Sequence, residues 1–414
     1  VIGVVLLWML IADKLYEHVT RCGAASIPEL VGYLYSSALA RAVSATVIVV
    51  MFSLYLVSVY KGGAIVLSTQ FGIDYAYALI IQAIPVIVYL VLGGMRGAVV
   101  VNLFLGMLML IAAAVTFTYV MAAVGGPING LEKISQTTIL GKPGSLWLRL
   151  DGMGPPPAME KGLVPVLIMS IATSIGIAQI ALPNLLLQFY AARDRKAIAR
   201  GRLLGPVLVA LYAMLMFSLG LYCHLILDQH LSEAQIAQLM KDTDRVIPET
   251  VKLLVPYGLR GLVFAAPIAA SMSTIALTVL TIANTFVRDI VGLAIKDLSD
   301  RRRLALSRVL VFVFALITIA LALHENSLII DIVSAAFGTI FACFVGPLTI
   351  GLYWRRASSE AAIASMIVGA VTGILWYIYL YRVLWIHPTI LATALALATF
   401  FGISIAFPNR KSSR

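Results

Sequence analysis

The sequence predicts an all-α integral membrane protein, and three observations lead to that fold class. Of the 414 residues, 61% are hydrophobic and only 12% are charged. A typical soluble domain has about 25% charged residues, so a globule with this composition could not cover its surface with polar groups. The apolar residues gather in long runs, and the basic residues gather in the short segments between those runs. We therefore expect lipid to be the solvent for most of the surface.

The long apolar runs are predicted to be membrane-spanning helices. Backbone groups inside a bilayer must be hydrogen-bonded within the chain, which favours helices over open strands. The segments that reach about the twenty residues needed for a span cover 39–69, 74–93, 97–124, 162–190, 203–228, 256–288, 304–323, 326–353, 359–382 and 386–407.

The first apolar run, 1–16, is shorter than the others. It begins at Val1 and meets Asp13 after a short stretch, without the charged start of a signal peptide. We interpret it as part of a truncated helix, which raises the total to about eleven spanning helices. The whole chain, 1–414, is then one polytopic transmembrane domain.

The distribution of Lys and Arg predicts the orientation in the membrane. Positive residues favour the cytoplasmic side in short loops. The four basic regions are 191–202, 289–303, 354–358 and the tail 408–414. These regions alternate with the helices so that all four lie on one side. We therefore expect a multi-pass protein of the plasma (inner) membrane with a cytoplasmic C-terminus and a basic cytoplasmic tail.

Other classes of protein are disfavoured by the same features. The net charge of +11 could suggest nucleic acid, but the basic residues are dispersed among short loops, so no nucleic-acid partner is predicted. Cys22, Cys223 and Cys343 have no spacing typical of a metal site or a disulfide framework. No pairing of nucleophile and base is visible, so we predict that the chain is not an enzyme.

Two adjacent hydroxyl residues, Ser273 and Thr274, lie in the middle of the segment 256–288, among small residues. Polar groups at this depth need a partner, a cavity or a ligand. Their oxygens are hard ligands of the kind that a small cation accepts. The alternative is that both hydroxyls bond to carbonyl groups one turn earlier in the same helix.

Several motifs in this chain resemble those of the sodium/solute symporter family. Segment 265–274 followed by Arg288-Asp289 looks like the signature helix of that family. Four further stretches resemble its other motifs in the same order along the chain: Gly93 to Val99, Pro183 to Gly201, Asp244 to Leu262 and Pro347 to Trp354. Within the family, 265–274, 364–369 and His387-Pro388 look most like the members that carry pantothenate.

This resemblance implies a fold of two inverted repeats of five helices, with binding sites near the bilayer midplane at broken helices. It implies that two N-terminal helices are missing here, so the first repeat is truncated. Ser273 and Thr274, with Ala270, match the family's cation-binding positions and would supply half of a Na⁺ site. The implied partners are Na⁺ as coupling ion, a small-molecule substrate and the lipid bilayer, with no other cofactor.

Asn102 is the predicted residue of the cation pathway, and Lys61 is a predicted substrate-lining residue. At Asn102, members of the family usually have an aspartate that is associated with the sodium exit path; asparagine keeps the dipole but loses the charge. Lys61 adds a cation in the outer part of segment 39–69. It either extends to the outer interface or faces the central cavity, where it could meet a substrate carboxylate or exchange a proton.

Segment 162–190 is the substrate-lining helix that the resemblance implies. Gly176 lies close to hydroxyl residues and could mark a break in the helix, and Ser174 and Gln179 are the predicted contacts with substrate. The alternative role for these polar groups is hydrogen bonding between helices.

The sequence therefore predicts a secondary active transporter that couples the uptake of a small organic solute, such as the carboxylate pantothenate, to Na⁺ by alternating access. Two alternatives stay open. One is a proton-coupled or uncoupled transporter, which Asn102 and Lys61 favour. The other is a non-transporting remnant or sensor module in the membrane.

Overall fold

The computed structural model describes residues 1–93, 95–139, 142–149, 156–190, 194–295, 299–324, 327–354 and 356–408. The side chains of 89–103, 142, 147, 156, 157, 188, 190 and 300 also lie outside the described part. The predicted basic tail falls almost entirely outside the described residues. Within those limits the chain is almost wholly helical, which confirms the predicted fold class.

The first half of the chain contains the elements α1 (Ile2–Leu6), η1 (Leu7–Ile11), α2 (Ala12–Cys22), α3 (Ile27–Tyr35), α4 (Ala38–Phe71), α5 (Tyr75–Gly93), α6 (Met95–Val124), α7 (Pro127–Gln136), β1 (Thr138–Ile139), β2 (Lys142–Pro143), α8 (Gly144–Trp147), α9 (Pro156–Glu160), α10 (Val164–Gly176), η3 (Ile177–Ala181) and α11 (Pro183–Tyr190). The two short strands pair antiparallel in the loop after α6.

The second half contains α12 (Arg195–Phe217), α13 (Leu219–His230), α14 (Glu233–Leu239), η4 (Thr243–Arg245), α15 (Val246–Leu254), α16 (Tyr257–Thr285), η5 (Phe286–Val291), α17 (Gly292–Ala294), α18 (Asp300–His324), α19 (Ile329–Phe344), η6 (Val345–Ile350), α20 (Ser359–Leu375), η7 (Trp376–Leu380), α21 (Tyr381–Leu384) and α22 (Pro388–Ala406).

Several helices begin where the sequence supplies a hydroxyl or carboxylate cap. Ser26 accepts a hydrogen bond from the Glu29 N–H at the start of α3, and Ser37 caps α4 in the same way. Asp194 and Ser358 cap α12 and α20. Each cap gives a partner to a backbone N–H that the first turn leaves unpaired.

In the described part of the chain, nine helices are long and apolar enough to cross a membrane, and 75–88 forms a shorter apolar helix. These ten helices correspond to the ten predicted spans of full length, and α1, η1 and α2 cover the shorter first apolar run. The chain is thus a multi-pass membrane protein.

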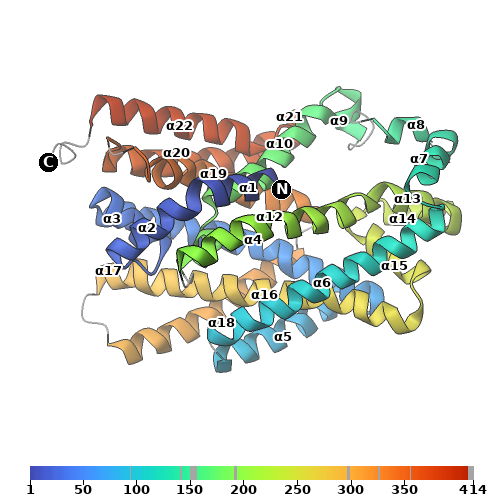
Figure 1. The fold of residues 1–414 in the computed structure, drawn as a ribbon, viewed down its shortest axis with the longest axis horizontal. Helices are drawn as coiled ribbons and strands as arrows, with labels where there is room; N and C mark the ends of the chain where they lie inside the picture. Colours follow the sequence, from blue (N-terminus) through green and yellow to red (C-terminus); the bar gives the residue numbers. More distant parts are fainter. Residues whose placement is uncertain are drawn as a thin grey trace.

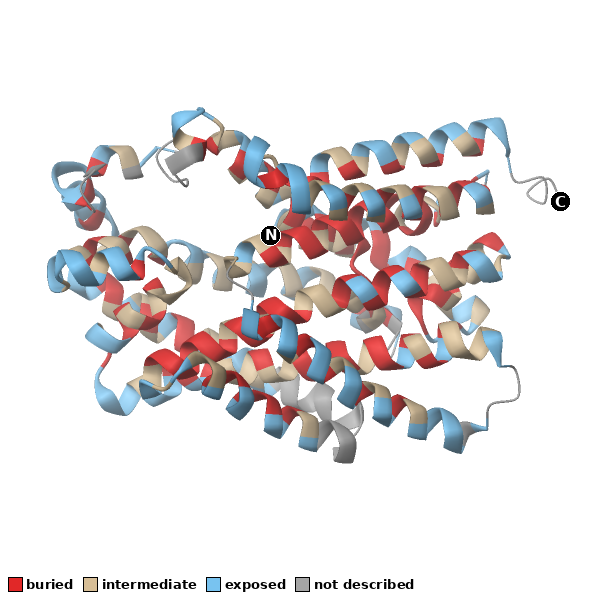
Figure 2. Cartoon of the chain, turned by 180° about the vertical axis from the view of Figure 1, so that it is seen from behind, coloured by how far each residue is buried: buried red, intermediate tan, exposed pale blue. Residues whose placement is uncertain are grey.

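Burial separates central helices from peripheral ones. In α19 with η6, 72% of the most apolar stretch is buried, whereas in α12 with α13 the share is 6%. Helix α4 packs against α16, α19, α3, α5 and α18, so it lies at the centre of the bundle. Figure 2 shows the buried residues concentrated along these inner helices and the exposed ones on the outer helices.

The two ends of the bundle differ in character. We call the end where α12, α18 and α20 begin and α22 ends the basic end, because the Arg-rich segments lie there. The opposite end, which carries α7, α8, α14 and α15, is called the loop end. Figure 1 shows α17 and the end of α22 at the basic end, and α7, α8 and α14 at the other.

Candidate functional site

The predicted cation-binding residues lie half-buried on α16, near the middle of its length. The hydroxyl of Thr274 donates a hydrogen bond to the carbonyl oxygen of Ala270, at 2.9 Å. The alternative expected from the sequence, a bond within the helix, is therefore present. The same bond places a carbonyl oxygen and a hydroxyl oxygen side by side, with Ser273 next in sequence. Oxygens in this arrangement can accept a small hard cation once the hydroxyl turns its proton away.

Three helices, α4, α5 and α16, pack closely beside this site. The Gln82 amide on α5 donates to the Ser271 hydroxyl on α16, at 2.8 Å, and both side chains are buried. Gly63 on α4 faces them, and a β-carbon there would overlap the Gln82 amide and the Ser271 oxygen. The glycine therefore allows α4 to approach α5 and α16 closely. The side-chain oxygen of Gln82 is buried and accepts no hydrogen bond from the described residues.

A pocket of about 210 Å³ lies between α4, α6, α12, α15 and α16, toward the loop end. Most of the residues that line it are aliphatic. Its aromatic side chains are Tyr212 and Phe264, and the described lining residues include a single ionisable acid, Asp244.

Lys61 is not one of the residues that line this pocket, although its neighbour Gly62 is. The Lys61 ammonium donates to the Ser327 carbonyl oxygen at 2.7 Å and lies 3.6 Å from a carboxylate oxygen of Asp244. Only 6% of the Lys61 side chain is exposed, so it does not extend to an interface. The carboxylate of Asp244 also accepts the Ile329 N–H, at 3.0 Å. The pair thus joins α4 to the η4 turn and to the start of α19.

Burial raises the pKa of the Asp244 carboxyl above its usual value. The Ile329 N–H and the Lys61 ammonium act in the opposite direction, but they do not outweigh the loss of solvent. The Lys61 ammonium therefore favours the ionised form of Asp244 against the effect of burial.

The helix predicted to line the substrate is interrupted where the sequence suggested. Helix α10 ends at Gly176, continues as the 3₁₀ segment η3, and passes through an extended Leu182 into α11. Gly3 on α1 approaches this break so closely that a β-carbon on it would overlap the Gly176 carbonyl. The Gln179 amide donates to the Ile175 carbonyl oxygen, at 3.2 Å.

Ser174 lies in a separate buried polar cluster. Its hydroxyl bonds to the Ser170 carbonyl oxygen, at 2.9 Å, and contacts the ring of His387 and the hydroxyl of Thr389. The other ring nitrogen of His387 meets the Ser334 hydroxyl, at 2.8 Å. This cluster joins α10, α19 and the start of α22, so in this conformation Ser174 connects helices. Its predicted contact with substrate stays a prediction.

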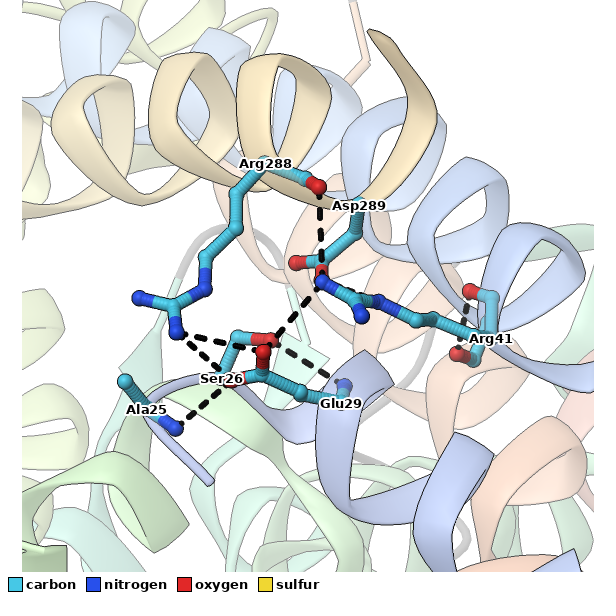
Figure 3. A network of polar contacts seen from close by, with 7 residues as sticks. Ala25, Ser26, Glu29, Arg41, Arg288 and Asp289 are labelled. Carbon is cyan, nitrogen blue, oxygen red and sulfur yellow. Dashed lines mark hydrogen bonds and ion pairs between the residues drawn. The ribbon is translucent and has the colours of Figure 1, made fainter. Parts of the chain in front are cut away.

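A network of charged side chains connects helices at the basic end (Figure 3). The guanidinium of Arg41, near the start of α4, is 2.7 Å from the fully buried carboxylate of Asp289 in η5. It is also 3.4 Å from Glu29 on α3, and Arg288 pairs with the same Glu29 at 2.9 Å. The Ala25 N–H donates to Glu29 at 2.8 Å. The network therefore ties the neighbouring helices α3 and α4 to η5, which lies 248 positions from Arg41 in sequence.

Burial acts to raise the pKa of the Glu29 carboxyl, but the Ala25 N–H and the Arg288 guanidinium outweigh it, so the pKa is lowered. Glu29 is consequently ionised at neutral pH and serves as the acceptor for both arginines. The side chain of Asn102 lies outside the described residues, so the prediction for the cation path remains untested.

Three parts of this arrangement were not predicted from the sequence. Asp244 entered only as the start of a loop motif, His387 only as part of a family motif, and Arg41 and Glu29 were not singled out. A charged residue close to the start of a spanning helix, as Arg41 is, was the available signal. The partner of each charge could not be read from the sequence.

Comparison with known proteins gives consistent results. A family model described as the sodium:solute symporter family matches residues 1–369. The sodium/pantothenate symporter of Escherichia coli (strain K12) is 28% identical over 392 residues, which cover 93% of this chain and 77% of the relative. The sodium/proline symporter of Salmonella typhimurium is 27% identical over 376 residues, covering 90% of this chain and 71% of the relative.

One solved structure has a similar fold. It is a substrate-bound, outward-open state of a Na⁺-coupled sialic acid symporter, and it matches with a TM-score of 0.73. The match covers 99% of this chain and 84% of the other, at 17% sequence identity.

Proposed function

The chain belongs to the sodium:solute symporter family, and on that premise we propose that it uses inward movement of Na⁺ to drive the uptake of a small organic carboxylate. The two relatives named above are symporters, and the chain is accordingly a transporter and not an enzyme. Pantothenate is the first substrate to test, because a pantothenate symporter is among these relatives.

The observation that carries the proposal is the pair of oxygens on α16. The Ala270 carbonyl and the Thr274 hydroxyl are 2.9 Å apart in the middle of a spanning helix, with Ser273 adjacent. A carbonyl and a hydroxyl offer a cation oxygen dipoles without fixed charge. Binding that is moderate and reversible suits an ion that must be released on the other side.

We place the basic end in the cytoplasm, in line with the positions of the Arg-rich segments. Each Na⁺ that enters then draws on roughly 2.3 kcal/mol per 100 mV of membrane potential, in addition to its concentration gradient. In this conformation the pair Lys61–Asp244 joins segments at the loop end, and Arg41–Asp289 joins segments at the basic end. Alternating access requires each of these contacts to open in turn.

Uptake by the purified full chain in lipid vesicles tests the proposal. Labelled pantothenate should accumulate under an inward Na⁺ gradient and not under a matched K⁺ gradient. Thr274→Ala should raise the Na⁺ concentration for half-maximal uptake by about tenfold, the effect of losing roughly 1.4 kcal/mol of binding.

Thr281→Ala is the matched control, because the Thr281 hydroxyl bonds to the Leu277 carbonyl in the same way, at 2.7 Å. It should leave the Na⁺ dependence unchanged. Uptake that ignores Na⁺ but follows a pH gradient would contradict sodium coupling and favour proton coupling. A well-folded chain that moves none of the tested solutes would support the non-transporting alternative.

A further inference from the structure

His387 lies at the centre of a buried polar cluster near the loop end. Its exposed fraction is 0%, and its backbone N–H donates to the Ser170 hydroxyl, at 3.0 Å. One ring nitrogen is 3.2 Å from the Ser174 hydroxyl, and the other is 2.8 Å from the Ser334 hydroxyl. Thr389 contacts both Ser174 and the ring, and we call these five residues the His387 cluster. The cluster joins α10, α19 and the start of α22.

The three helices approach closely at this cluster. Helix α10 packs against both α19 and α22. Gly338 on α19 faces the cluster, and a β-carbon there would overlap the Thr389 hydroxyl and lie 3.2 Å from the Ser174 hydroxyl. The imidazole ring and the hydroxyl groups around it therefore meet in a tightly packed contact between the helices.

Helix α10 is the half of an interrupted span that lies toward the loop end. It ends at Gly176, and the chain passes through η3 and an extended Leu182 before α11 begins. Changes of backbone angles at a break of this kind move one part of a chain relative to the other. Because the His387 cluster attaches α10 to α19 and α22, such a movement of α10 requires the contacts of the ring to open.

The described hydrogen bonds of the ring are made to uncharged groups. On α19 the carboxylate of Asp331 accepts the Tyr381 hydroxyl, at 2.7 Å, and the Tyr381 ring packs edge-to-face on the imidazole, with 5.1 Å between centroids. Arg382 on α21 donates to a serine hydroxyl, and Lys161 donates to a backbone carbonyl of α21, both at 3.2 Å. An imidazolium whose hydrogen bonds go to uncharged groups is costly to bury.

Burial accordingly lowers the pKa of the His387 ring from 6.5 to about 3, against the opposing effect of a hydrogen bond to the backbone of Asp331. When α10 moves away and water reaches the ring, its pKa returns toward the ordinary value. The joined arrangement is therefore fully favoured above pH 6.5 and loses that advantage as the pH falls toward 3. Between about pH 7.5 and about pH 5, the equilibrium shifts toward separation by about thirtyfold.

We propose that His387 is a proton-binding site that controls the position of α10. The neutral ring holds α10 against α19 and α22, and protonation from the loop end releases α10 and opens the contacts of Ser174. This inference goes beyond the proposed function, because it concerns a proton and a helix movement and not the solute or the coupling ion. With the basic end in the cytoplasm, acid outside the cell favours the released conformation.

Cysteine labelling measures this release without requiring transport. Leu167 on α10 is 5% exposed and belongs to an apolar cluster with α21, so Leu167→Cys reports the separation of these elements. The full chain, with Cys22→Ser, is placed in lipid vesicles and labelled with a membrane-impermeant maleimide; the two remaining native cysteines are buried. The labelling rate is divided by that of the exposed position Glu160→Cys at the same pH. This ratio should rise by about thirtyfold from about pH 7.5 to about pH 5.

Variants in the Leu167→Cys chain assign the effect to the ring. His387→Gln should abolish the rise, because the glutamine amide does not titrate in this range. His230→Gln is the matched control and should keep the full rise, since His230 is an exposed histidine at the loop end that contacts a carbonyl of its own helix, at 2.8 Å. Ser334→Ala removes a partner of the ring and should speed labelling by about fivefold at about pH 7.5, the effect of one lost hydrogen bond.

The outcomes separate this inference from the proposed function. A labelling ratio that stays constant with pH in the chain with His387 would overturn the inference, and so would an equal rise in His387→Gln. Unchanged labelling of the Ser334→Ala variant would also overturn it, because the cluster would then not hold α10. A chain that moves no solute but shows the full pH-dependent release would contradict the proposed function and support the proton-binding site.

Discussion

The charge network at the basic end supports a quantitative prediction for Arg41→Gln. The substitution keeps a polar side chain but removes the cation that lies 2.7 Å from Asp289. The Asp289 side chain is fully buried, so it cannot turn to water for compensation. Breaking a buried ion pair by removing one partner typically costs 3–5 kcal/mol.

The expected cost is at the lower end of that range. Arg41 is 21% exposed, and solvent screens part of its interaction. We therefore expect Arg41→Gln to lower the free energy of unfolding by about 3 kcal/mol. Glu29→Gln should cost about 1 kcal/mol or less, because Glu29 is 25% exposed and its partners can be solvated. The double variant Arg41→Gln with Asp289→Asn should recover part of the loss, since no charge is left buried alone.

Two measurements check this prediction. Unfolding in mixed detergent micelles gives the free energies. The rate of maleimide labelling at Cys22, which is half-buried near α3, reports local opening, while Cys223 and Cys343 are buried. Arg41→Gln should speed labelling of Cys22 more than Glu29→Gln does. The reasoning would be refuted if the two single variants were equally stable, or if the double variant were less stable than Arg41→Gln by the full cost of a second independent loss.

Further predictions concern packing and pH. Gly63→Ala should destabilise the chain by about 1–3 kcal/mol, because its β-carbon would overlap Gln82 and Ser271. Gly62→Ala is the matched control, since its β-carbon would lie 3.6 Å from Ile329. Equal melting temperatures of the two variants would contradict the argument. Gly373→Ala should also destabilise, since its β-carbon would overlap the Thr339 hydroxyl and methyl groups, and Thr339→Ala, which removes both, should relieve part of that loss in the double variant. Burial lowers the pKa of His387 from 6.5 to about 3, so the folded chain holds this ring neutral. The stabilisation that the neutral His387 ring provides is full above pH 6.5 and is lost as the pH falls from there toward 3. The difference in the free energy of unfolding between wild type and His387→Gln should therefore narrow over that interval. A difference that stays constant with pH would refute this reasoning.

The sequence was sufficient to predict the helices but not the contacts between them. Runs of apolar residues required helices, so each predicted span is present, and Gly176 does end an α-helix. The neighbours Ala270, Ser273 and Thr274 share one helix, so their proximity follows from local spacing. The binding of Na⁺ by these three residues stays a prediction.

Contacts between distant segments were beyond sequence reasoning. Lys61 was expected either at the interface or facing a cavity, and its pairing with Asp244, which is far along the chain, was not predicted. Arg41 and Asp289 are likewise separated by 248 positions. A single sequence contains no signal for such pairs, because each partner alone resembles an ordinary charge near a helix end.

Helix α4 carries the cation of two buried ion pairs, Arg41–Asp289 toward the basic end and Lys61–Asp244 toward the loop end. They are separated by 20 positions on one uninterrupted helix, which corresponds to about 30 Å. Both ion pairs are therefore attached to one continuous helix, so a rigid tilt of α4 changes the Lys61–Asp244 and Arg41–Asp289 distances together. In a transport cycle that uses such a tilt, a solute that binds better when Lys61–Asp244 is open shifts the equilibrium of Arg41–Asp289 by the same factor. Arg41→Gln would then change the affinity for a solute that binds about 30 Å away.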